Sequence, residues 1–251
     1  MRHRKRETPY CIASCRPAAH APRRADTPPN GTTTLHGIFV TGTDTGSGKT
    51  FASCALLRAW RAQGLRASGM KPVASGSVTT PQGLRNEDAL ALLAASDPAP
   101  AYADCNPFAY EPPIAPHVAA ALADRPVALD VIIAAHARIA AHCTRSVVEG
   151  VGGWLAPLSD TLMQADLVHA LDLRVVLVVG VRLGCINHAL LSARAIRADG
   201  CRLVGWIANR IDPHMAEADA SIAAIGSRIE APLLATLAWH EAAPRFTLDG
   251  C

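Results

Sequence analysis

The stretch Gly42-Thr43-Asp44-Thr45-Gly46-Ser47-Gly48-Lys49-Thr50 decides the fold of this 251-residue chain. It follows residues 36–41 (HGIFVT), a short apolar run typical of a buried strand. It precedes residues 50–63 (TFASCALLRAWRAQ), whose apolar side chains recur at helical spacing. A glycine-rich turn between a strand and a helix directs backbone N–H groups and the positive end of the helix toward an anion. The stretch therefore predicts a phosphate-binding loop.

The second half of this loop carries its chemistry. Gly46 and Gly48 allow the backbone to approach phosphates, Lys49 can neutralise them, and Thr50 offers a hydroxyl to magnesium. The usual pattern has four residues between its first glycine and Gly-Lys-Thr, which would put a glycine at position 43, where this chain has Thr43. An ordinary glycine-rich turn is the alternative, but the position between strand and helix favours a site for a nucleoside triphosphate with Mg²⁺.

Short apolar runs alternate with helical stretches along the rest of the chain. We predict strands at residues 65–73, 146–149, 174–180, 202–208 and 232–236, and helices at residues 87–95, 129–142, 187–198 and 215–228. This alternation favours a single α/β domain with a doubly wound, mostly parallel sheet and helices on both faces, of the P-loop NTPase type. Ligands of such sheets bind at the carboxyl ends of the strands.

The basic charge of the chain is concentrated at its start. Residues 1–34 hold seven of the 24 lysines and arginines and two of the 21 acidic residues, which leaves 17 basic and 19 acidic residues beyond them. A slightly acidic fold argues against a nucleic-acid partner. We expect a disordered basic N-terminal extension over residues 1–34 and the domain over residues 35–251. A transit peptide is one interpretation of the extension, and an upstream translation start is the preferred one.

The cysteines and the apolar runs indicate the cellular compartment of the protein. The eight cysteines are scattered with no pair at C-x-x-C spacing, so neither a zinc site nor a redox pair is indicated. Free thiols fit a reducing compartment. No apolar run reaches the roughly 20 residues that a membrane helix needs. We expect a soluble cytoplasmic protein.

Lysine is scarce, since the chain has three lysines beside 21 arginines. Lys49 and Lys71 are the two within the predicted domain. Lys71, in residues 70–76 (MKPVASG), follows the second predicted strand at the ligand-binding edge. A compact ammonium suits a transferring phosphoryl group. The alternative is a strand-end lysine that extends into solvent.

Two carboxylates are expected at the same edge. Glu149 follows the apolar run of residues 146–148, where P-loop proteins hold magnesium. Asp88 lies at the start of a predicted helix, where complementing the helix dipole is the alternative interpretation. Residues 184–188 (GCINH) form a further glycine-containing helix start that suits an anion. We reject Cys185 and His188 as a nucleophile and base because no acyl-transfer scaffold accompanies them.

Taken together, these segments resemble the dethiobiotin synthase family. The matching runs are residues 41–50 (TGTDTGSGKT), 71–76 (KPVASG), 84–89 (LRNEDA), 148–160 (VEGVGGWLAPLSD), 178–189 (VVGVRLGCINHA), 205–209 (GWIAN) and 232–234 (PLL). They are spread in family order over almost all of residues 37–239. The longer spacing of the phosphate loop is that family's own form.

The resemblance implies a role for each matching residue. Lys71 is the implied catalytic lysine, assisted by Lys49, and Asn209 is expected to read the adenine edge. The implied ATP-binding residues are Gly46, Ser47, Gly48, Lys49, Thr50, Phe51, Asp88, Glu149, Gly150, Val151, Gly152, Asn209 and Arg210. The implied magnesium ligands are Thr50, Asp88 and Glu149. The implied substrate-binding residues are Thr45, Ser75, Gly184, Cys185, Ile186 and Asn187, of which the last four would cap the substrate carboxylate from a neighbouring subunit.

The reaction implied by the resemblance joins 7,8-diaminononanoate and CO₂ at the expense of ATP and closes the ureido ring of dethiobiotin. The implied assembly is a homodimer with its site at the subunit interface. Arg210 is a departure, because an acidic residue is common there, and it leaves base recognition open. Residues after Trp239 do not match the family well.

Three other classes of protein fit the sequence less well. A cobyrinate-type amidotransferase needs a glutaminase domain, for which 251 residues leave no room. A partition-type ATPase switch carries a lysine early in the phosphate loop, where this chain has Asp44. A structural protein with a degenerate loop is disfavoured by the intact Lys49-Thr50 pair and by both carboxylates.

Overall fold

The computed structural model describes residues 37–239 and 245–247. The extension expected over residues 1–34 lies outside the described residues, so its disorder and the domain boundary after it stay predictions.

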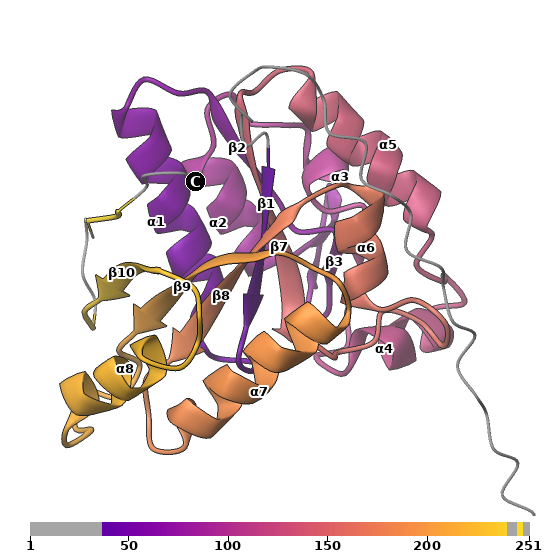
Figure 1. Ribbon diagram of the computed structural model, residues 1–251. Helices are drawn as coiled ribbons and strands as arrows, with labels where there is room; N and C mark the ends of the chain where they lie inside the picture. Colours follow the sequence, from indigo (N-terminus) through magenta and orange to yellow (C-terminus); the bar gives the residue numbers. More distant parts are fainter. Residues whose placement is uncertain (1–36, 240–244, 248–251) are drawn as a thin grey trace, which may run out of the picture. The chain divides into compact units, whose positions relative to one another are not determined.

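A six-stranded parallel sheet forms the centre of the fold (Figure 1). Its strands, in spatial order, are β10 (Leu233–Leu237), β9 (Leu203–Asn209), β8 (Arg174–Gly180), β1 (Gly37–Gly42), β7 (Arg145–Gly153) and β2 (Ala67–Met70). All neighbours in this sheet pair in parallel. Because β1 lies between β7 and β8, the chain leaves β1 at the point where the strand order reverses, which is the usual ligand position in such sheets.

Helices cover both faces of this sheet because the side chains of a strand alternate between faces. Phe39 packs into one apolar cluster, whereas Ile38 and Val40 pack into the other. The Phe39 side is covered by α4 (Pro116–Leu122), α5 (Leu129–Ala140), α6 (Gln164–Ala170), α7 (Cys185–Ala198) and α8 (Ala218–Gly226). The other side is covered by α1 (Lys49–Ala62) and α2 (Glu87–Ala95). The predicted doubly wound α/β fold is confirmed.

The segment between β2 and β7 is more elaborate than predicted. It contains α3 (Tyr102–Cys105), a parallel pair of β3 (Val73–Ala74) with β6 (Phe108–Ala109), and an antiparallel pair of β4 (Val78–Thr80) with β5 (Gly83–Arg85). The strand predicted at residues 65–73 is therefore divided. Pro72 has no N–H to donate to a continued ladder, and the chain leaves the main sheet after Met70.

Other boundaries differ by a few residues. The strand predicted at 146–149 extends to Gly153, and α7 begins at Cys185 rather than at residue 187. The helix predicted at 215–228 is shorter, at Ala218–Gly226. The short helices α3, α4 and α6 were not predicted, because one or two turns offer too few positions for a helical period to be read.

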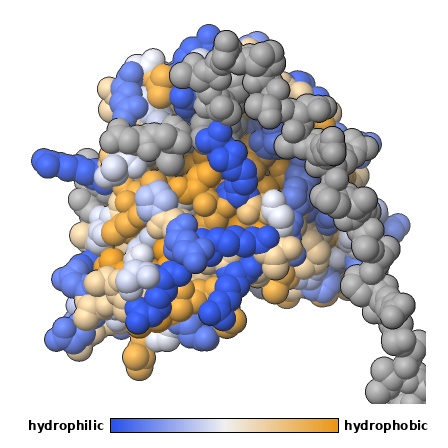
Figure 2. Space-filling model, viewed as in Figure 1, coloured by the Kyte–Doolittle hydropathy of each residue, from blue (hydrophilic) through white to orange (hydrophobic). Residues whose placement is uncertain are grey.

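Some large apolar side chains remain on the surface. Leu183 is 92% exposed, and Leu155 and Leu191 are also exposed. On the face drawn in Figure 2, apolar surface is interrupted by hydrophilic side chains. None of the helices within the described ranges is long and apolar enough to cross a bilayer.

Candidate active site

The phosphate loop connects β1 to α1, as predicted. Gly46 and Gly48 have φ values of 78° and 84°, in the left-handed region that glycine adopts without strain. Gly48 is also the residue before the first turn of α1, and a Cβ there would overlap the side-chain amide of Asn209. The positive φ therefore favours glycine at both positions, and the close approach of Asn209 is a second reason for it at Gly48. With no side chain in the way, the backbone N–H groups at the start of α1 remain accessible to an anion.

A cavity of about 840 Å³ opens over this loop. Its floor includes the loop and the first turn of α1, and its walls come from the ends of β2, β3 and β7 and the start of α2. The predicted site residues that line it are Thr45, Gly46, Gly48, Lys49, Thr50, Lys71, Ser75, Asp88, Val151 and Gly152. The fold thus brings together residues that the sequence separates by about a hundred positions.

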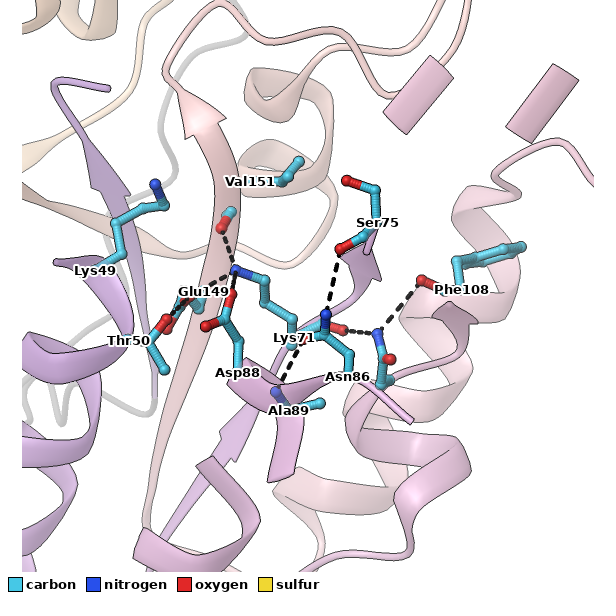
Figure 3. Close-up of polar contacts among 12 residues, drawn as sticks. Lys49, Thr50, Lys71, Ser75, Asn86, Asp88, Ala89, Phe108, Glu149 and Val151 are labelled. Carbon is cyan, nitrogen blue, oxygen red and sulfur yellow. Dashed lines mark hydrogen bonds and ion pairs between the residues drawn. The ribbon is translucent and has the colours of Figure 1, made fainter. Parts of the chain in front are cut away.

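Lys71 is the centre of the charged cluster in this cavity (Figure 3). Its Nζ atom lies 2.6 Å from Glu149 Oε1, 3.0 Å from Asp88 Oδ2 and 3.1 Å from the carbonyl oxygen of Gly150. The hydroxyl of Thr50 donates to the same Glu149 oxygen at 2.8 Å. The side chains of Lys71 and Glu149 are 4% and 0% exposed. The ammonium is therefore held by three acceptors, away from bulk water.

The charges of this cluster depend on one another. Burial acts against the Lys71 ammonium, but the Glu149 and Asp88 carboxylates outweigh it and raise the pKa of Lys71. Burial also acts against the Asp88 carboxylate, but the Lys71 ammonium lowers the pKa of Asp88 overall. Burial, together with the nearby Lys71, lowers the pKa of Lys49 from 10.5 to about 8. A negative charge bound next to Lys49, such as a phosphate, would stabilise its ammonium form.

Thr50, Asp88 and Glu149 also fit a divalent cation. Hard cations such as Mg²⁺ prefer hydroxyl, carboxylate and phosphate oxygens. Glu149 Oε2 is buried and makes no hydrogen bond within residues 37–239 and 245–247, so one carboxylate oxygen has its lone pairs unused. No group of three or more His, Cys, Asp or Glu suited to a metal occurs in that part of the chain. A cation bound by these three side chains would take its remaining oxygen ligands from phosphate or water.

A second, smaller cavity of about 220 Å³ lies at the end of β9. Phe51, Asn209 and Arg210, all predicted to bind ATP, line it together with Ile211, Ala238 and Trp239. The Asn209 amide donates to the carbonyl oxygen of Ser47 at 3.0 Å, which ties this cavity to the phosphate loop. Arg210, where the family often has an acidic residue, forms an ion pair with Asp219.

Four predicted substrate-binding residues lie elsewhere. Gly184 precedes α7, with Cys185, Ile186 and Asn187 in its first turn. None of them lines either of these two cavities. Cys185 is buried within the apolar cluster on the Phe39 side. The fold of the single chain therefore does not place residues 184–187 in the lining of either cavity.

Two groups of site residues were missed by the sequence analysis. Residues 113–116 (PIAP) form an apolar wall of the larger cavity. Gln164 fixes the loop after Glu149: its amide donates to the carbonyl oxygens of Gly153 and Trp154 at 2.6 and 3.1 Å, and its oxygen accepts from the Val151 N–H at 3.1 Å. Residues 113–116 and Gln164 lie before or at the start of the short helices α4 and α6, which show no readable period in a single sequence.

The fold and the site together define a P-loop nucleotide-binding protein. A family model described as an AAA domain matches residues 36–244. An ATP-dependent dethiobiotin synthetase BioD of Xanthomonas euvesicatoria is 58% identical over 206 residues, covering 82% of this chain and 92% of that protein. The corresponding protein of Xylella fastidiosa is 56% identical over 198 residues, covering 79% and 88%. The chain belongs to the ATP-dependent dethiobiotin synthetase family, which confirms the predicted resemblance.

Solved structures of much lower sequence identity share the fold. Chloroplast FtsY from Physcomitrella patens has a TM-score of 0.50 at 16% identity, covering 86% of this chain and 63% of that chain. Cell division protein FtsY from Thermotoga maritima has a TM-score of 0.50 at 16% identity, covering 89% and 67%. The chain spans about two thirds of the length of these structures, and their likeness concerns the fold alone.

Proposed function

We propose that this chain is the ATP-dependent ligase that closes the ureido ring of dethiobiotin in biotin biosynthesis. Its substrates are 7,8-diaminononanoate, CO₂ and ATP, and its other products are ADP and phosphate. The observation that carries the proposal is the Lys71 ammonium, buried between Glu149 and Asp88 in the cavity that the phosphate loop lines. Family membership supplies the identity of the substrates.

The reaction proceeds in three steps in this cavity. One substrate amine adds to CO₂ and loses a proton, giving a carbamate. A carbamate oxygen attacks the γ-phosphorus and ADP leaves, giving a carbamic-phosphoric anhydride. The second amine attacks the carbonyl carbon and phosphate leaves, which closes the ring. The last step needs no protein nucleophile, because a held amine gains its effective concentration from proximity.

The lysines and the cation site offset the negative charge that accumulates between carbamate and triphosphate. Lys49 and the N–H groups of residues 46–50 bind the β- and γ-phosphates. Lys71 contacts the carbamate and the transferring phosphoryl group, both of which lie within its cavity in this proposal. Thr50, Asp88 and Glu149 would hold Mg²⁺, which would supply positive charge to the phosphates there.

The remaining lining residues orient the organic parts of the substrates. Thr45 and Ser75 contact the diamine or its carbamate, and the apolar residues 113–116 face its alkyl chain. In the smaller cavity, Asn209 hydrogen-bonds the adenine edge. Because Arg210 is already paired with Asp219, it contributes to the shape of that cavity rather than a free charge.

We also propose a cytoplasmic homodimer in which α7 of one subunit completes the site of the other. Residues 184–187 line neither cavity of their own subunit, and Leu183 just before them is 92% exposed. Because a single exposed apolar side chain is common on any surface, the expectation of a dimer comes from family membership, and Leu183 is where it is tested. Sedimentation velocity should give a dimer at micromolar concentration, and a Leu183→Asp variant should shift it toward monomer. A wild-type protein that sediments as a monomer contradicts the proposal.

The activity is tested by direct product analysis. Purified protein is incubated with Mg-ATP, ¹³C-bicarbonate and the diamine, and dethiobiotin is measured by mass spectrometry. We expect labelled dethiobiotin and ADP in equal amounts, with no product when the diamine or ATP is omitted. ATP hydrolysis that does not respond to the diamine, without any dethiobiotin, would overturn the assignment.

A further inference from the structure

The backbone of Lys71 is held from outside the main sheet. Lys71 follows the last residue of β2, so the ladder with β7 does not fix it. Its N–H instead donates to the carbonyl oxygen of Cys105 at 2.7 Å, and its carbonyl oxygen accepts from Asn106 Nδ2 at 2.7 Å. Asn106 is buried. The position of Lys71 therefore depends on the end of α3.

The carboxylate partner Asp88 is held by a second buried asparagine. Asn86 precedes α2, and its side-chain oxygen accepts from the Ala89 N–H at 3.2 Å, which caps the helix that carries Asp88. Its Nδ2 donates to the carbonyl oxygen of Ser75 at 3.3 Å (Figure 3). Asn86 thus fixes both the start of α2 and the strand-end segment that lines the cavity.

One hydroxyl joins these two asparagines. Tyr102 OH donates to Asn106 Oδ1 at 3.0 Å and accepts from the backbone N–H of Asn86 at 2.8 Å. The Arg85 guanidinium lies over the Tyr102 ring, 4.1 Å from its centroid. The ring is therefore held from two sides, and its hydroxyl links the segment that holds Lys71 to the segment that holds Asp88.

We propose that Tyr102 is a positioning residue for the reaction: its hydroxyl, through Asn106 and Asn86, sets the Lys71 Nζ to Asp88 Oδ2 distance of 3.0 Å. The proposal rests on the proposed function, because it takes Lys71 as the catalytic lysine. Lys71 and Asp88 come from segments that share no strand ladder, and apolar packing of α2 against β2 does not define hydrogen-bond geometry. A misplacement of the order of 1 Å at a site of this kind costs up to about a hundredfold in rate.

Tyr102→Phe removes the hydroxyl oxygen that joins Asn86 to Asn106 and keeps the aromatic ring. Tyr110→Phe is the matched control, because the Tyr110 hydroxyl donates to the carbonyl oxygen of Arg125 at 2.7 Å on a side chain that is 1% exposed. Tyr102→Phe loses two hydrogen bonds and Tyr110→Phe loses one, and only Tyr102 contacts the residues that support Lys71 and Asp88. Each is measured for thermal midpoint, for kcat of dethiobiotin formation and for KM of ATP.

We expect Tyr102→Phe to lower kcat about tenfold with KM of ATP changed less than about twofold, and Tyr110→Phe to leave kcat unchanged. Asn106→Asp, which removes the donor to the Lys71 carbonyl oxygen, is expected to lower kcat further. Equal kcat in wild type and Tyr102→Phe, or equal losses in the two tyrosine variants, overturns the inference while leaving the activity in place. Wild-type protein that forms no dethiobiotin overturns the proposed function instead.

Discussion

Lys71→Met should lower kcat for dethiobiotin formation by about 10²- to 10³-fold, the usual cost of removing a preorganised charge at a developing anion. KM of ATP should change little, since the phosphate loop and Lys49 remain. The reason lies in the position of the ammonium, 2.6 Å from Glu149 and 3.0 Å from Asp88 inside the main cavity. Steady-state kinetics with both substrates separate kcat from KM.

Lys49→Met is the matched control for this experiment. Lys49 Nζ contacts the carbonyl oxygen of Asp44 at 3.2 Å within the phosphate loop. Its loss should raise KM of ATP more strongly than Lys71→Met does. A further readout is binding of Mn²⁺ without nucleotide, measured by electron paramagnetic resonance. Lys71→Met should bind Mn²⁺ more tightly, because the ammonium competes for the same Glu149 and Asp88 oxygens. Full activity of Lys71→Met contradicts the assigned role.

Glu149→Gln should have the largest effect on stability. The substitution keeps the shape of the side chain but leaves the buried Lys71 ammonium with a single carboxylate partner. Removing one member of a buried ion pair typically costs about 3–5 kcal/mol in free energy of unfolding. We expect a loss of that order in urea unfolding, together with loss of Mg²⁺-dependent turnover.

Asp88→Asn provides the comparison for Glu149→Gln. Both variants lose a proposed magnesium ligand, so both should lose activity. The Asp88 side chain is 43% exposed, however, whereas that of Glu149 is 0% exposed. The free energy of unfolding should therefore fall by less than about 1 kcal/mol in Asp88→Asn. Similar stability losses in the two variants would show that burial does not explain the difference expected between the Lys71–Glu149 and Lys71–Asp88 ion pairs.

Much of the candidate site could be predicted because its parts follow strands. The phosphate loop, Lys71 and Glu149 each come after a run that reads as a strand, and parallel strands place their carboxyl ends at one edge. That rule needs no knowledge of which strands are neighbours. It placed these residues in one cavity although the order of β7, β1 and β8 could not be read from the sequence.

The unpredicted parts depend on contacts between irregular segments. Tyr102, Asn106 and Gln164 lie in or beside short helices, and their hydrogen bonds reach backbone groups that no periodic pattern identifies. The short strand pairs between β2 and β7 are equally hidden, since two or three residues cannot display an alternation. The proposed role of residues 184–187 requires a second subunit, which one sequence does not describe.

The shared Glu149 oxygen has a consequence for folding. It accepts hydrogen bonds from Thr50 and Lys71, which are 99 and 78 positions away along the chain. Each pairing closes a long loop of chain, and we expect this entropy cost to place them after the local contacts of helices during folding. In the proposed function, a triphosphate and its cation would bind at this junction and stabilise it by mass action. The proposed substrate would therefore stabilise the state in which the segments that carry Thr50, Lys71 and Glu149 have all come together. Nucleotide binding would then report that these three segments have assembled.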